Sequence, residues 1–130
     1  MQNAQMIFSS VPSRNYLPVY GEANKLDYKQ AVELMDLHHK DIANATNTPI
    51  KSVRFDSRIP MEVAKRIEEW VVLLELVAEF FEGNVDKAIL WFRTPNYLLG
   101  NISPRDMIRF GRYKKLMKYV QNALAGNQSA

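Results

Sequence analysis

The stretch from Ala88 to Arg112, AILWFRTPNYLLGNISPRDMIRFGR, constrains the fold of this chain more than any other, because nearly every residue in it has a local structural role. It opens with apolar residues at helical spacing. Pro95 follows, and proline lacks a backbone N–H and disfavours helical geometry in the residue before it. We therefore predict a helix that ends near Thr94, with a change of chain direction after it.

The second half of this stretch predicts a tight turn and then a new helix. Gly100 and Asn101 are the residue types that adopt positive φ most readily, so the turn belongs there. Ser103 is a favoured N-cap, Pro104 suits the first helical position, and Asp106 lies where a capping box has its acid. The whole stretch is thus predicted to form a helix, a corner and a second helix.

These residues resemble the C-terminal toxin-binding domain of the Xre/MbcA/ParS family of bacterial antitoxins. Members carry a pattern similar to A-x-x-W-[LF]-x-x-P-N-x-x-L-G-G-x-x-P-x-D-[LM]-[LI], and the similarity extends over roughly Gly83 to Leu124. Asn101 stands where the family has a second glycine, and asparagine tolerates the same left-handed conformation, so the turn is expected to be kept. The matching residues are Ala88, Trp91, Phe92, Pro95, Asn96, Leu99, Gly100, Pro104, Asp106, Met107 and Ile108.

Earlier in the chain, three short helices are predicted in the arrangement of a helix-turn-helix. The first begins after Leu26, and the second runs from about His39 to Ala45. A third is predicted to begin with Thr48 as its cap and Pro49 at its first position. Two short helices, a tight turn and a third helix form this motif.

The segment KDIANATNTPIKSVR also resembles the helix-turn-helix of Xre-type proteins, with Asn47 at the usual glycine position and Pro49 where the family has a capping serine. In such a motif the third helix enters the major groove of DNA. Arg54 is the favoured base reader and Lys51 a phosphate contact. The alternative is a basic helix that is merely solvated. The residues predicted to bind DNA are Thr48, Lys51, Ser52, Arg54 and Arg58.

The longest predicted helix runs from Met61 to Phe81, with Pro60 before it and Gly83 after it. Its second half is apolar on nearly every side, which indicates either a central position or a surface shared with another chain. We predict that it contributes to a homodimer interface, and a monomer with a deep core is the alternative. It is too short and too charged to cross a membrane, which requires about 20 apolar residues.

A last helix is predicted from Arg112 to about Leu124, with its end at Gly126 and a flexible tail over residues 126–130. The family resemblance implies that this helix and tail contact a toxin near its active site. The toxin-binding residues it implies are Asn96, Arg112, Lys115 and Tyr119. The residues that build the corner are Trp91, Pro95, Leu99, Gly100 and Pro104, and Trp91 is expected to be buried.

Composition excludes several other classes of protein. The chain has no cysteine, so disulfides, thiolate metal sites and a cysteine nucleophile are excluded. His38 and His39 are adjacent and point about 100° apart on a helix, so they do not form a metal site together. No phosphate-binding loop or nucleophile elbow is present. We expect no catalytic residues, no metal and no cofactor, and a cytoplasmic location without a signal peptide.

The sequence thus predicts an all-α protein with an N-terminal arm (1–25), a helix-turn-helix unit with the central helix (26–82), a toxin-binding domain (83–125) and a tail (126–130). The resemblance implies an antitoxin of a type II toxin–antitoxin pair. It would block a RES-type toxin that consumes NAD, and it would repress its own operon by binding operator DNA. A stand-alone DNA-binding regulator is one alternative, and an interaction module that has lost DNA binding is another.

Overall fold

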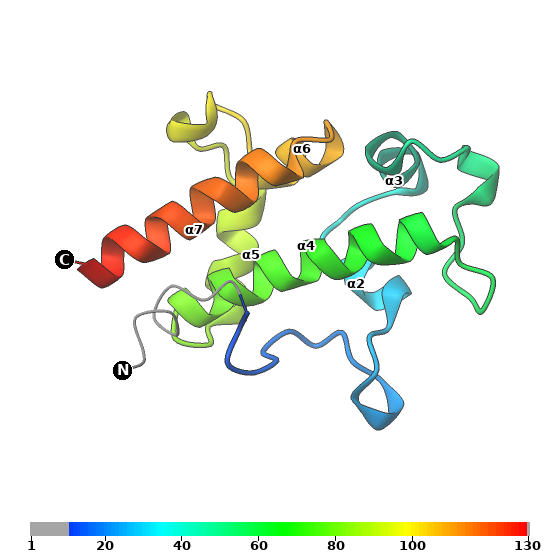
Figure 1. Ribbon diagram of the computed structural model, residues 1–130, viewed down its shortest axis with the longest axis horizontal. Coiled ribbons are helices and arrows are strands. Elements are labelled where there is room, and N and C mark those ends of the chain that lie inside the picture. Colours follow the sequence, from blue (N-terminus) through cyan, green and yellow to red (C-terminus); the bar gives the residue numbers. More distant parts are fainter. Residues whose placement is uncertain (1–10, 130) are drawn as a thin grey trace.

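The computed structural model describes residues 11–129, which form six α-helices and three short 3-10 helices and no β-strand (Figure 1). The all-α fold class predicted from the sequence is therefore confirmed. The elements in chain order are η1 (Glu22–Asn24), α2 (Tyr28–Leu34), α3 (His39–Thr46), η2 (Ile50–Ser52), α4 (Met61–Phe80), α5 (Val85–Arg93), η3 (Tyr97–Leu99), α6 (Pro104–Arg109) and α7 (Tyr113–Ser129).

Helix α4 is the axis of the molecule, and α2, α3, α5 and α7 all contact it. It begins after Pro60, whose extended backbone serves as the N-cap, and the chain leaves it through Gly83 at a φ of 85°. Both ends therefore agree with the sequence prediction. In Figure 1, α5 and α7 lie on one side of α4, above it in this view. The N-terminal segment runs along the other side, below α4.

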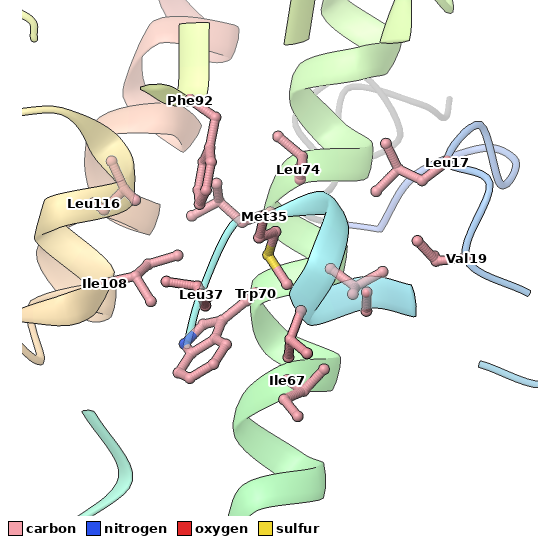
Figure 2. Close-up of a cluster of buried hydrophobic side chains, with 14 of the residues drawn as sticks. Leu17, Val19, Met35, Leu37, Ile67, Trp70, Leu74, Phe92, Ile108 and Leu116 are labelled. Atoms are coloured by element: carbon pink, nitrogen blue, oxygen red, sulfur yellow. The ribbon is translucent and has the colours of Figure 1, made fainter. Parts of the chain in front are cut away.

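One hydrophobic core joins the two units that the sequence predicts. Figure 2 shows Met35 and Trp70 from the N-terminal unit in one cluster with Phe92, Ile108 and Leu116 from the C-terminal unit. Ten residues of α4 are buried in this core or next to it. Most of the apolar second half of α4 is therefore covered within the chain, although Phe80 is 45% exposed. The contribution of this helix to a homodimer interface stays a prediction.

The third helix of the predicted helix-turn-helix is absent from the described residues. The turn after α3 forms as expected, with Asn47 in the left-handed conformation at a φ of 54°. Pro49 then has a ψ of 138°, which is not helical, and η2 is a single turn of three residues that ends at the extended Val53. The N-cap role predicted for Thr48 is not observed, because its hydroxyl bonds to Thr46 instead.

A partly buried ion pair ties α3 to α6, with Asp41 buried and Arg109 about one third exposed. Asp41 Oδ1 accepts a hydrogen bond from Arg109 Nε at 2.8 Å, and Oδ2 accepts one from the amide of His38 at 2.9 Å. Arg109 also donates to Asp106 at 2.7 Å. Burial acts to raise the pKa of Asp41, but the hydrogen bonds from Arg109 and His38 and the charge of Arg105 outweigh it and hold the pKa below its usual value. The two predicted units are thus linked by charge as well as by apolar packing.

The last helix is longer than predicted. Gly126 lies inside α7, which continues to Ser129, so the prediction that Gly126 ends the helix is wrong. A glycine inside a helix costs about 1 kcal/mol relative to alanine, and the alanine and leucine residues just before it favour continuation. Of the predicted flexible tail, Ala130 lies outside the described residues.

The N-terminal arm is described from residue 11, and residues 1–10 of the predicted flexible segment lie outside the description. Residues 11–20 have no helix, yet Leu17 and Val19 are buried against α4 (Figure 2). Glu75 of α4 is only 1% exposed and accepts hydrogen bonds from the amide of Tyr16 at 2.7 Å and the hydroxyl of Tyr20 at 2.6 Å. The described part of the arm is therefore fastened to the central helix.

Candidate protein-binding surface

The corner after α5 is organised by Asn96. Its side-chain oxygen accepts a hydrogen bond from the amide of Leu98 at 2.9 Å, and its backbone N–H donates to the carbonyl of Ile102 at 3.1 Å. Gly100 and Asn101 close the turn with φ values of 82° and 67°. The predicted turn is therefore confirmed, including the replacement of the family's second glycine by asparagine. In Figure 1 this corner projects from the body of the molecule.

The helix that follows the corner starts with the predicted N-cap and proline, but the Asp106 carboxylate binds Arg109 and not the N-cap amide that a capping box would use. The Ser103 hydroxyl accepts a hydrogen bond from the amide of Asp106 at 3.0 Å, and Pro104 occupies the first turn. The carboxylate of Asp106 binds Arg109, so its charge serves the contact with α3. The chain leaves α6 through Gly111 at a φ of 75°. After this turn the chain enters α7, which contacts both α6 and α4.

Two apolar hollows lie side by side where α4, α5, α7 and the corner meet. The first has a volume of about 170 Å³ and the second of about 580 Å³. Phe81 and Trp91 line both, so we treat them as one surface, the corner groove. The residues of the corner groove are Val77, Phe80, Phe81, Lys87, Leu90, Trp91, Thr94, Pro95, Asn96, Tyr97, Tyr119, Val120, Ala123 and Leu124.

Large apolar side chains around the corner groove are open to solvent. Leu90 is 68% exposed and Tyr97 is 79% exposed, and Leu98 and Phe80 are exposed as well. Single exposed apolar residues are common on soluble proteins, but a cluster around a groove marks a surface that binds another macromolecule. Lys87 is the only charged residue that lines the groove among the described residues, which favours an apolar partner surface over a small charged ligand.

The structure brings together two of the four predicted toxin-binding residues. Asn96 Nδ2 lies 3.5 Å from the hydroxyl of Tyr119, and both residues line the corner groove. Arg112 and Lys115 lie at the other end of α7, in a cleft of about 480 Å³ that Arg66 also lines. Lys115 and Tyr119 are four residues apart on one face of α7, and Arg112 directly precedes the first residue of this helix.

The structure does not assemble the five predicted DNA-binding residues on one helix. Lys51, Arg54 and Arg58 are exposed, but they lie on η2 and on the irregular segment after it. Arg54 forms two hydrogen bonds with Asp56, at 2.8 Å and 2.6 Å, which occupy the donor fork that would read a base. Ser52 is half-buried. A helix able to enter the major groove is therefore missing from this part of the described chain.

The corner residues differ from expectation at one position. Trp91 was expected to be buried, whereas it is only half-buried and lines both hollows of the corner groove. Its neighbour Phe92 takes the core position, together with Ala88. Sequence analysis missed Leu90 and Tyr97 as surface residues. The sequence did contain a sign that Leu90 and Tyr97 lie on the surface. Each is a large apolar residue outside the matched pattern and without an assigned structural role.

No group of three or more histidine, aspartate or glutamate side chains among the described residues is placed to hold a metal ion. Within residues 11–129, no helix has the length and apolar character needed to cross a membrane.

The fold and the corner groove define an all-α protein with an exposed apolar surface of the kind that binds other proteins. Comparison with known proteins gives this class a family context. The chain is 32% identical over 72 residues to Antitoxin Xre of Yersinia enterocolitica, a match that covers 52% of this chain and 49% of that protein. The chain thus spans about half the length of the curated relative it matches. The resemblance to Xre-type antitoxins is confirmed by this similarity.

Other comparisons add less. No protein-family model matches the chain. Among solved structures, the chain is similar to one in the crystal structure of the M. tuberculosis MbcT-MbcA toxin-antitoxin complex. That similarity has a TM-score of 0.49 and 22% sequence identity, and it covers 78% of this chain and 92% of the other.

Proposed function

We propose that this chain is the antitoxin of a type II toxin–antitoxin pair and acts in the cytoplasm. Its partner is a RES-type toxin that consumes NAD. The chain itself carries out no chemical reaction and needs no cofactor. Similarity to an Xre antitoxin supports the class of function. The observation that carries the proposal is the corner groove, an exposed apolar surface lined mostly by the segment of residues 83–124 that resembles the toxin-binding domain of that family, including its matched residues Trp91, Pro95 and Asn96.

The mechanism we propose is steric. The corner groove binds an apolar patch of the toxin, with the Asn96–Tyr119 pair supplying polar contacts at its edge. Helix α7 continues beyond Leu124, its last residue in the groove, to Ser129, and this end is proposed to cover the entrance of the toxin's active site. Exposed Lys115 on α7 and exposed Arg112 just before it add charge that suits an acidic rim on the toxin.

Co-purification with the product of the adjacent reading frame tests this proposal. Leu90→Glu places a charge on the apolar surface and is expected to weaken the complex at least about tenfold, because the charge would be buried without a partner. Met61→Glu is the matched control. Met61 is 71% exposed, as Leu90 is 68% exposed, but it lies at the far end of α4 and does not line the groove.

The outcomes of this experiment separate the alternatives. Loss of the complex with Leu90→Glu and retention with Met61→Glu would support the corner groove as the toxin site. A complex that survives both changes would move the contact to α7. No complex with the unchanged chain would contradict the antitoxin function. A C-terminal truncation of α7 would test that contact. The truncated chain should still extend to Ala125, because Leu116 and Val120 are core residues and their removal would unfold the protein.

Repression of its own operon is the second candidate function. It is favoured by the exposed cations Lys51 and Arg58, which suit phosphate contacts. Because η2 is a single turn, we expect only weak binding that does not depend on sequence. In a gel-shift assay, operator and scrambled DNA should shift alike, and both shifts should disappear as salt is raised. A salt-resistant shift of the operator alone, lost in Arg54→Ala, would show that a recognition helix forms on DNA.

A further inference from the structure

The arm of residues 11–20 is held by a receptor on α4 that consists of two carboxylates. Glu75 accepts hydrogen bonds from the amides of Tyr16 and Leu17 and from the hydroxyl of Tyr20. Glu79 accepts from the amide of Ser13 at 2.7 Å and from its hydroxyl at 2.6 Å. Neither carboxylate forms an ion pair with a basic side chain in residues 11–129. The receptor is therefore satisfied by the arm itself.

Apolar contacts complete the attachment. Leu17 and Val19 are buried in the core, and the ring of Tyr16 packs over Gly83, where an added Cβ would lie 3.3 Å from it. Burial, followed by the hydrogen bond to Glu75 and its charge, raises the pKa of the Tyr20 phenol, which keeps this donor protonated. None of these contacts depends on the arm and its receptor belonging to the same molecule.

The link between the arm and α2 has the properties of a hinge. Residues 21–25 are all exposed, and the loop they form projects away from the body of the molecule (Figure 1). Ala23 has a φ of 54° and Asn24 a φ of 59°. The left-handed conformation is unfavourable for alanine, so opening this loop relieves strain at Ala23, while it breaks the backbone hydrogen bonds that close the loop, such as the one from the Gly21 amide to the Lys25 carbonyl at 2.7 Å. Fully extended, five residues span roughly 17 Å, which is enough to carry the arm away from its own α4.

We propose that this chain forms a dimer by exchanging arms, so that residues 11–20 of one copy bind Glu75 and Glu79 of a second copy. Exchange reproduces the contacts of the arm with Glu75, Glu79 and the core, loses the hydrogen bonds inside the loop of residues 21–25, and opens two strained hinges, a known route to domain-swapped dimers. It requires no apolar surface on α4 beyond what the arm already covers. The corner groove stays open in each copy, so the dimer carries two binding sites.

Crosslinking distinguishes an exchanged arm from a closed one. The chain has no cysteine, so Ser13→Cys and Glu79→Cys introduce the only two thiols, and Glu75 still holds the arm. A short bismaleimide then joins the arm to its receptor. A closed arm gives a chain of monomer mass on a denaturing gel, whereas an exchanged arm gives a covalent dimer. We expect a dimer band that grows with protein concentration, and neither single-cysteine variant should give it.

Hinge variants provide the second measurement, by light scattering of the full chain. Ala23→Gly tolerates a φ of 54° and should lower the dimer association constant by about tenfold, whereas Ala23→Pro excludes that φ and should raise it by a similar factor. Only monomeric crosslinks at every concentration would overturn the proposal. A dimer that is not crosslinked through these cysteines, or that ignores both hinge changes, would overturn it as well, because it would form through another surface.

Discussion

Replacing Phe92 by alanine is expected to lower the free energy of unfolding by about 3–5 kcal/mol. Phe92 is fully buried, and its ring points from α5 into the cluster that joins both halves of the chain (Figure 2). Removal of the ring leaves a cavity in a close-packed core. Because domains of this size are stable by only about 5–15 kcal/mol, the variant should unfold at a much lower urea concentration, which circular dichroism will measure.

Leu90→Ala is the matched control for this prediction. Leu90 lies on the same helix, two residues earlier, but it faces solvent in the corner groove. We expect its effect on unfolding to stay within about 0.5 kcal/mol. If both variants lost the same stability, α5 would not separate a core face from a binding face, and the corner groove would lose its basis.

Replacing Glu75 by leucine is expected to cost about 3 kcal/mol, because two backbone amides and the Tyr20 hydroxyl lose their acceptor. The arm should then detach, and a protease should cleave within residues 11–25 far faster than in the unchanged chain. Glu75→Gln keeps one acceptor oxygen in nearly the same place, so its loss should be clearly smaller. Equal losses for the two variants, or an arm that stays protected in Glu75→Leu, would contradict the role assigned to this carboxylate.

The corner could be predicted almost completely from the sequence, because its determinants are local. Pro95 ends α5, Gly100 and Asn101 take positive φ, and Ser103 caps α6. Each of these effects acts within one or two residues of its cause. The limits of α4 were predictable for the same reason.

The absence of the third helix of the DNA-binding motif could not be predicted from the sequence, because two local signals conflict there. Thr48 and Pro49 are a cap and a first helical residue by type, but a ψ of 138° at Pro49 delays the helix, and Val53 is already extended and buried. A burial requirement at Val53 therefore overrides the propensity of the short segment before it.

The candidate binding surface was predictable only in part. Asn96 and Tyr119 were chosen from the resemblance and do line the corner groove. Arg112 and Lys115 lie elsewhere, because a helix of this length carries its ends to different neighbours. The contact between Glu75 and Tyr16 spans 59 residues of sequence, and no periodic pattern reveals a partner at that separation.

The distance along the chain between the arm and its receptor also has a consequence during synthesis. Glu79 follows Ser13 by 66 residues, so a ribosome adding roughly 5–20 residues per second completes the receptor several seconds after the arm has been made. During that interval the nascent arm has no site on its own chain. On an mRNA that carries several ribosomes, finished copies of α4 lie close by. The order of translation therefore leaves an interval in which neighbouring nascent chains can pair before the arm can close on its own chain.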